Sequence, residues 1–377
     1  MAFEQIPVTR SVLTWARTRA GYSFKDLEGD FKKIASWESP EGTFPTYPQL
    51  ERLADKLKVP VAVFFFPEPP DIPPIEETFR TLGPDQIDMI PPRVRLLLRK
   101  ARAFQMSLAE LTNGHNPAGR IITRDLAFDA KGSVSAMAKK AREYIGISLE
   151  EQMSWGDPDI ALKHWRRALL DVGVYVFKDK FRQEDYSGFS LYDDEFPIIY
   201  VNNTTAKTRQ AFTLFHELAH LIFHTSGIDT LTDDYINTLP KDNKQIEIAC
   251  NRFAARFLVP EDAFQNAFSG SAPSAETAEE LADLFNVSRE FIFRKFLDQG
   301  LISQTVYKAA AKRWADQKKT GTGGDWYRNT IAYLGQEYID LAFSQYHQNR
   351  IDESQLADYL DVKPKLLLTL EEYVSGG

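Results

Sequence analysis

One segment limits the fold of this chain more than any other: residues 213–224, with the sequence TLFHELAHLIFH. Apolar residues recur in and before it at helical spacing, which predicts a helix over about residues 204–224 with one side packed on a core. His216 and His220 are four positions apart, so a helix places both imidazoles on one face, opposite the apolar side. The segment therefore predicts an amphipathic helix that presents two imidazoles side by side.

This arrangement of side chains is typical of a metal site. His216, Glu217 and His220 form the pattern H-E-x-x-H, in which two imidazoles one turn apart can hold one metal ion. Glu217 lies about 100° round the helix from His216, where its carboxylate can act as a general base without binding the metal. The expected metal, Zn²⁺, needs a third protein ligand and an open position for water. The alternative is a chance pair of surface histidines.

A second predicted helix, residues 244–258, offers the third ligand. We choose Glu247, with Asn251 one turn later on the same face, where it could orient the carboxylate. A third histidine six residues after His220 is excluded, because Ser226 stands there. The alternatives left open are three aspartates in the loop-like stretch SGIDTLTDD: Asp229, Asp233 and Asp234.

Three further side chains are candidates for hydrogen bonding to a transition-state oxyanion. His224 lies one turn beyond His220, but about 80° round from His216, so we expect it to pack at the helix end or to support the oxyanion. Tyr192 and Tyr200 are the other two candidates. The strand-like run FPIIYVNN, which contains Tyr200, could pair with an extended peptide substrate.

Composition limits where the chain works and what it binds. Cys250 is the only cysteine, so no disulfide within the chain and no thiolate zinc cluster can form. The most apolar run, residues 59–66, is too short to cross a bilayer and contains a proline, so we expect no membrane partner and a cytoplasmic location. The chain has 45 basic and 53 acidic residues, and this negative net charge argues against nucleic-acid binding over its whole surface.

A local basic helix remains a candidate nucleic-acid surface. Residues 92–104, PRVRLLLRKARAF, are helical in pattern and dense in positive charge. The alternative is an ordinary solvated helix face. The candidate residues are Arg93, Arg95, Arg99, Lys100 and Arg102.

Three pieces of sequence resemble one family. The pieces IIYVNN, TRQAFTLFHELAHLIFH and EIACNRFAARFLVP occur in the order found in the ImmA/IrrE group of bacterial zinc metallopeptidases, within about residues 162–301. The resemblance implies a zincin-type fold, zinc held by His216, His220 and Glu247, and Glu217 as base. It also implies cleavage of a partner repressor or antitoxin of the Xre type, under DNA-damage or mobile-element control, with single-stranded DNA as an activator of some members.

The N-terminal stretch resembles the Xre helix-turn-helix module that often precedes this peptidase. It departs from that module because residues 27–37 leave room for barely one helix, whereas a DNA reader needs two and a turn. Residues 1–70 also carry nine basic and nine acidic side chains, so this module has no net positive charge that would attract the phosphates of DNA. We expect a degenerate module that serves protein docking or dimerisation, and hence a homodimer as one candidate state.

These readings predict an α+β, mostly helical chain: a zincin-like core with a small sheet, preceded by a helical module and followed by helical C-terminal segments. The expected domains are residues 1–70, the helix-turn-helix-like module; 71–160, a proline-rich linker and helical connector; 161–301, the metallopeptidase; and 302–377, a C-terminal helical region.

Function is then a choice between three hypotheses. The first is a zinc endopeptidase that cleaves a specific protein and so switches transcription. The second is a DNA-binding regulator in which the peptidase unit is a sensor or docking platform, and the third is a toxin–antitoxin component. Glu217 favours the endopeptidase hypothesis, because a peptidase domain that has lost its activity has no chemical need for a general base beside two metal ligands.

Overall fold

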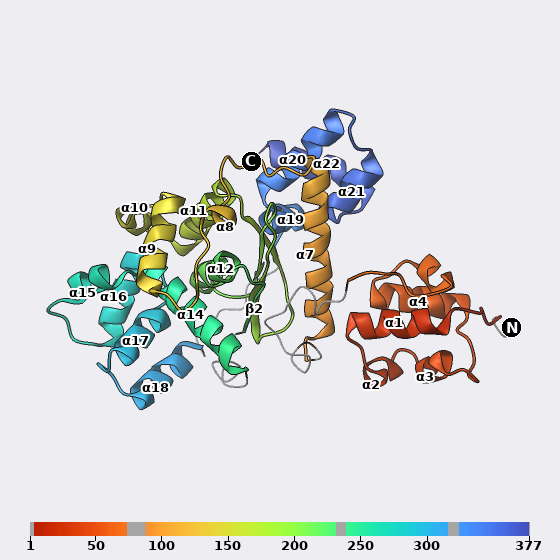
Figure 1. Cartoon of the computed structure of the whole chain (residues 1–377), viewed down its shortest axis with the longest axis horizontal. Helices are drawn as coiled ribbons and strands as arrows, with labels where there is room; N and C mark the ends of the chain where they lie inside the picture. The colour runs from red at the N-terminus through yellow and green to blue at the C-terminus, as the bar shows by residue number, and fades with distance from the viewer. Residues whose placement is uncertain (1–3, 74–86, 88, 231–238, 316–323, 377) are drawn as a thin grey trace. The chain divides into compact units, whose positions relative to one another are not determined.

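The computed structural model describes the chain except for residues 1–3, 74–86, 88, 231–238, 316–323 and 377 (Figure 1). Its described part is mostly helical and contains one four-stranded sheet. The predicted fold class, a mostly helical α+β chain with a small sheet, is therefore confirmed.

Contacts divide the chain into two compact units, residues 1–100 and 101–377, and the division falls within α7 (Pro92–Leu111). The four expected domains stay a prediction. Their boundaries after residues 160 and 301 both lie inside the second unit. Of the predicted proline-rich linker at the start of the 71–160 region, the structure describes residues 71–73.

The first unit consists of short helices round one apolar core. The Arg17 guanidinium donates two hydrogen bonds, of 2.7 and 2.9 Å, to the Glu38 carboxylate and so ties the first helix to the third. Ser23 begins the second helix in a reciprocal capping box with Asp26. The helices are α1 (Arg10–Ala20), α2 (Phe24–Glu28), α3 (Ile34–Glu38), α4 (Tyr47–Leu57) and the 3-10 helix η1 (Val61–Phe65). α2 and α3 have five residues each, so residues 27–37, where barely one helix was expected, contain the end of one short helix and most of another.

The sheet of the second unit has the strand order β1-β3-β2-β4. β1 and β3 are parallel, whereas β2 pairs antiparallel with both β3 and β4. The strands are β1 (Tyr175–Asp179), β2 (Tyr186–Leu191), β3 (Ile198–Asn202) and β4 (Ile228–Thr230). Because β3 is hydrogen-bonded on both sides, the prediction that FPIIYVNN pairs with a peptide substrate is wrong; the sheet edges are β1 and β4.

The two faces of the sheet pack against different helices. Side chains alternate along β3, so Ile199 and Val201 join the core that contains α12 (Lys207–Ile222), while Tyr200 points to the other face. There Tyr200 stacks on Phe189, and Phe177 stacks on Phe104 of α7 at a centroid distance of 4.5 Å. The sheet is thus covered on both faces, and Figure 1 shows α12 beside the strands.

Glycine at position 188 allows α12 to lie directly on β2. A Cβ atom there would come within 2.5 Å of the Thr213 methyl group and 2.8 Å of the Tyr200 carbonyl oxygen. Ser187 and Ser190 on the same strand are fully buried. β2, with the sequence YSGFSL, has two serines, a glycine and no β-branched residue, so its local pattern is weaker than that of a typical strand, which explains why β2 was not predicted.

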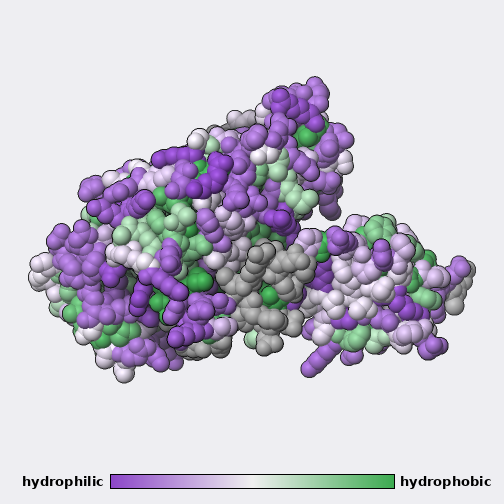
Figure 2. Space-filling model, viewed as in Figure 1, coloured by the Kyte–Doolittle hydropathy of each residue, from purple (hydrophilic) through white to green (hydrophobic). Residues whose placement is uncertain are grey.

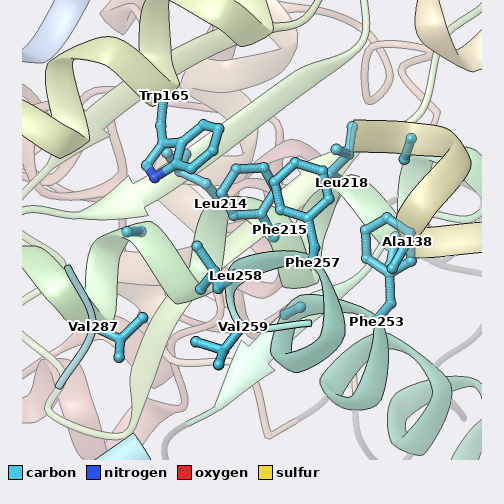
Figure 3. Packing of buried hydrophobic residues seen from close by; sticks show 14 of the residues in the cluster. Ala138, Trp165, Leu214, Phe215, Leu218, Phe253, Phe257, Leu258, Val259 and Val287 are labelled. Carbon is cyan, nitrogen blue, oxygen red and sulfur yellow. The ribbon is translucent and has the colours of Figure 1, made fainter. Parts of the chain in front are cut away.

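Aromatic rings join the remaining helices of the core to α12. Phe215 of α12 stacks on Phe257 of α14 (Lys241–Leu258) with centroids 3.9 Å apart, and Trp165 meets Phe215 edge-on at 4.8 Å (Figure 3). The helices round this core are α8 (Ile122–Asp125), α9 (Val134–Ile145), α10 (Leu149–Ser154), α11 (Pro158–Asp171), α15 (Glu261–Phe268), α16 (Ala275–Phe285), α17 (Arg289–Asp298) and α18 (Gln304–Ala315).

The C-terminal helices begin at the edge of the sheet. α19 (Trp326–Leu334) contacts β1, and Tyr338 of α20 (Gln336–His347) packs edge-on against Phe177 of β1. The chain ends with α21 (Glu353–Leu360), the 3-10 helix η2 (Pro364–Leu366) and α22 (Leu367–Ser375).

None of the described helices combines the length and the apolar character needed to cross a membrane. Figure 2 shows hydrophilic residues over much of the visible face, with smaller apolar areas between them.

Candidate metal centre

α12 and α14 bring together the three predicted metal ligands. Nε2 of His216 lies 3.3 Å from Nε2 of His220, and each of these atoms lies 3.3 Å from a different carboxylate oxygen of Glu247. The contacts run in opposite order along the two helices, from Phe215–Phe257 to His220–Glu247, so the helices are antiparallel. Packing of the aromatic core therefore sets the position of Glu247 opposite the histidines.

The donor atoms have the spacing that a tetrahedral metal ion needs. Bonds of about 2.0–2.1 Å from a tetrahedral zinc ion place its ligand atoms about 3.3–3.4 Å apart. The 3.3 Å between the two imidazole nitrogens matches this value, and each nitrogen lies 3.3 Å from one of the two Glu247 oxygens. With one ligand atom from each residue, all three atoms lie within 4.8 Å of one another, and all three side chains are buried. His216, His220 and Glu247 therefore could hold one metal ion.

Hydrogen bonds at the far side of each imidazole orient the pair. Nδ1 of His216 lies 3.1 Å from Oδ1 of Asn251, and Nδ1 of His220 lies 3.3 Å from the Thr225 hydroxyl. An Nδ1–H that donates to these oxygens leaves Nε2 as the free lone pair that a metal requires. Asn251 thus supports His216 rather than Glu247, which differs from the predicted contact, and Thr225 was not anticipated.

Charge in the cluster is balanced among buried groups. Burial lowers the pKa of His216, but the carboxylates of Asp229, Glu247 and Glu217 outweigh it and raise the pKa to about 9. Burial likewise raises the pKa of Glu247, but the two imidazoles outweigh it and hold that pKa well below its usual range. Without metal His216 would therefore carry a proton that metal binding must displace.

Glu217 lies beside the cluster with one oxygen held and one unused. The Ser190 hydroxyl donates a 2.6 Å hydrogen bond to Oε2, while Oε1 is buried without a partner among the described residues. Burial raises the pKa of Glu217 to about 7, against the lowering effects of His220 and His216. A carboxylate with a pKa near neutrality and an open acceptor atom suits proton transfer from water.

Ser190 should influence the pKa of the Glu217 carboxylate. Its hydrogen bond stabilises the charged form of Glu217 and so lowers the pKa. We expect Ser190→Ala to raise the pKa of Glu217 and to shift the acid limb of any reaction in which Glu217 is the general base upward by about one pH unit. A pH–rate profile checks this, and a profile identical to that of the wild type would show that the hydroxyl only fills space.

Gly227 gives the imidazole of His220 room to lie against the backbone. A Cβ atom at this position would come within 2.4 Å of Cδ2 of the ring. We expect Gly227→Ala to push the ring aside and weaken metal binding by roughly tenfold or more, as loss of outer contacts does. Competition with a metal-binding dye measures the affinity. Gly119→Ala, where an added Cβ meets nothing within 4 Å, is the control and should bind metal as the wild type does.

The open alternatives for the third ligand are resolved in part. Asp229 accepts hydrogen bonds from Arg209 and Thr213, at 2.9 and 3.1 Å, and is not one of the three clustered ligands. It acts on the site through its charge, because it raises the pKa of His216. Asp233 and Asp234 lie outside the described residues.

The three oxyanion candidates have other contacts. His224 follows the end of α12 with a φ of 55°; its Nε2 lies 3.0 Å from the Thr123 carbonyl oxygen, and its ring lies against Tyr192. These contacts favour the packing role. Tyr192 donates its hydroxyl to Asp194, and Tyr200 lies on the sheet face opposite Ser190, so its candidacy is wrong because strand alternation turns it away.

The basic helix does not present its five cations as one surface. Arg95 is 7% exposed and donates to the carbonyl oxygens of Ile87 and Ile90, while Arg99 donates to that of Leu57. Arg102 donates to Gln105. The predicted nucleic-acid surface is therefore wrong at Arg95 and Arg99, because these two side chains are turned to backbone carbonyl oxygens of the protein. The predicted surface consisted of Arg93, Arg95, Arg99, Lys100 and Arg102.

Known proteins are similar to the part of this chain that contains the cluster. Residues 170–296 match the family model described as the IrrE N-terminal-like domain, of the M78 peptidases. Two relatives, each named radiation response metalloprotease IrrE, come from Deinococcus deserti and Deinococcus radiodurans, and each is 32% identical to this chain over 99 residues. The match covers 26% of this chain and 34% and 30% of the relatives, so it spans about a third of their length.

A solved structure of a Mycobacterium tuberculosis transcriptional regulator aligns over 50% of each chain, with 17% identity and a TM-score of 0.28, which is too weak to support an argument. The family match, by contrast, contains the whole cluster of His216, Glu217, His220 and Glu247. Residues 170–296 therefore resemble the IrrE N-terminal-like domain of the M78 peptidases, and the two metalloprotease relatives support the same resemblance.

Proposed function

We propose that this chain is a zinc-dependent endopeptidase in which His216, His220 and Glu247 hold the metal and Glu217 is the base. The observation that carries the proposal is the cluster of two imidazole nitrogens 3.3 Å apart, each 3.3 Å from one oxygen of the Glu247 carboxylate, beside the buried Glu217 carboxylate with an open acceptor atom. Zinc, when bound, would polarise the scissile carbonyl and lower the pKa of water to about 7.

The chain's own residues would then move the proton. Oε1 of Glu217, which has no partner among the described residues, accepts a proton from the attacking water. Ser190 holds the other oxygen, so the carboxylate keeps its orientation while its charge changes. Glu217 next gives the proton to the leaving amine, which completes hydrolysis of the peptide bond.

The substrate we propose is one specific partner protein in the cytoplasm, a transcriptional repressor or antitoxin of the Xre type. Support for this substrate and for a setting in the response to DNA damage comes from the family resemblance, and the two relatives are named for a response to radiation. The helical first unit would dock the partner or a second copy of the chain. Its equal numbers of acidic and basic residues support docking over DNA reading.

Co-expression with an Xre-type repressor encoded beside this chain tests the proposal. We expect the repressor to be cut at one site, with fragments that mass spectrometry can assign. A repressor that stays intact with wild-type chain containing zinc, under every inducing condition that releases repression, would contradict cleavage and favour a sensor or docking role.

Single-stranded DNA is the activator that the resemblance implies, and the proposal treats it as a sequence-independent ligand. We expect binding of oligonucleotides to weaken steeply with salt and to show little preference among sequences, because phosphate contacts dominate such binding. Fluorescence anisotropy across a salt series measures both. Tight binding of one duplex sequence that is lost on removing residues 1–73 would instead support a DNA-reading first unit.

A further inference from the structure

Two phenylalanines from different helices form an apolar surface beside the metal cluster. Phe212 of α12 lies one turn before His216, and the centroids of the two rings are 6.4 Å apart. Phe291 of α17 meets Phe212 edge-on, with the ring centroids 6.0 Å apart. The two rings, here called the Phe212–Phe291 wall, therefore continue directly from the first metal ligand.

Helix geometry places Phe212 on the same side of α12 as the metal ligands. Residues four positions apart lie about 40° apart round a helix, so Phe212, His216 and His220 form one row along α12. Helical side chains also lean toward the N-terminus of their helix, so the ring of His216 lies over the turn that begins at Phe212. A ligand held at the metal cluster therefore has Phe212 as its neighbour on this side.

The wall differs in its exposure from the aromatic core behind it. Phe215, Phe253 and Phe257, which lie together in Figure 3, are at most 1% exposed. Phe212 and Phe291, by contrast, are only half-buried. Aromatic surface that stays open beside a few convergent polar side chains is typical of a ligand site. The wall therefore has the character of a binding surface rather than of core.

Arg209 fixes the position of the Phe212 ring. Its guanidinium carbon lies over that ring, 5.1 Å from the centroid. The guanidinium donates hydrogen bonds to the Ser187 hydroxyl at 2.9 Å and to the two carboxylate oxygens of Asp229 at 3.2 and 2.9 Å. Because Asp229 balances the charge of Arg209, this arginine supports the ring without making the surface selective for anions.

We propose that the Phe212–Phe291 wall receives a large apolar side chain of the substrate, such as leucine, methionine or phenylalanine, next to the scissile bond. The inference rests on the proposed function, because the wall can select a substrate only if the metal cluster cleaves one. A large apolar side chain removes both rings from water, whereas an alanine leaves most of their surface wet. Phe212 and Phe291 are thus specificity-determining residues.

Binding of hydroxamates tests the wall without any cleavage, because the hydroxamate group chelates zinc while its substituent contacts the neighbouring surface. By calorimetry, we expect the full chain loaded with zinc to bind hydrocinnamohydroxamate, which carries a phenyl group, roughly tenfold or more tightly than acetohydroxamate. Phe212→Ala and Phe291→Ala should each reduce this ratio to about threefold or less. The affinity for acetohydroxamate should stay within about twofold, because its methyl group is too small to reach the wall.

Two further variants serve as controls. Phe291→Leu keeps an apolar side chain at the wall and should retain most of the preference for the phenyl group. Phe268→Ala removes a half-buried ring of α15 that packs on Phe264 and Phe296, and should bind both compounds as the wild type does. Equal affinity of the wild type for the two compounds, or an unchanged ratio in Phe212→Ala and Phe291→Ala, would overturn the proposal. Wild-type chain that contains zinc but binds neither compound would instead overturn the proposed metal site, and the wall as a subsite with it.

Discussion

Glu217→Gln is expected to abolish cleavage of the partner protein while zinc stays bound. The amide fills the same space beside Ser190 but cannot accept a proton from water, so the chemical step loses its base. Removal of a general base typically costs about 10²- to 10⁴-fold in rate. Because the side chain is buried and is not one of the three clustered ligands, metal content should remain one zinc per chain.

The measurement is cleavage in co-expression and with purified proteins, with zinc determined by mass spectrometry in each sample. Glu143→Gln, the same chemical change at an exposed position of α9, is the control and should cleave normally. Equal cleavage by the wild type and Glu217→Gln would reject this residue as the base.

Replacing any of the three ligands should release zinc. We expect His216→Ala, His220→Ala and Glu247→Ala each to weaken zinc binding by more than the roughly 10- to 100-fold that loss of an outer contact costs. Each change also leaves the remaining buried polar groups without a partner, so the Tm should fall and added zinc should restore little of it.

Two controls distinguish the ligands from nearby groups. His347→Ala removes an exposed imidazole, which is paired with Glu371, and should keep zinc. Asp229→Ala should also retain zinc, although more weakly, because its carboxylate acts on His216 only through charge. Zinc retained by Glu247→Ala and lost by Asp229→Ala would show that the third ligand was assigned wrongly.

The sequence predicted the parts of the site that a single helix determines. Spacing of four positions suffices to place His216 and His220 together, and one helical turn suffices to pair Glu247 with Asn251 on a common face. Which imidazole Asn251 meets depends on how α14 packs against α12. That packing is set by ring contacts such as Phe215–Phe257, which no local pattern specifies.

The missed features depend on contacts between distant segments. Ser190 and Gly227 meet α12 only after β2 and β4 have paired, and a glycine- and serine-rich strand carries little local signal. The same holds for β3, whose apolar sequence suited either an edge or a central strand. Charge density alone predicted a basic surface on α7, yet Arg95 is buried because a long side chain can serve packing as well as recognition.

The location of zinc tests the central claim most directly. Crystals of the wild-type chain, with diffraction data collected on both sides of the zinc absorption edge, would show the metal as an anomalous difference peak. We predict one strong peak per chain, about 2.0–2.2 Å from Nε2 of His216, Nε2 of His220 and a carboxylate oxygen of Glu247. A peak bound by other residues, or no zinc peak in protein that cleaves its partner, would contradict the account.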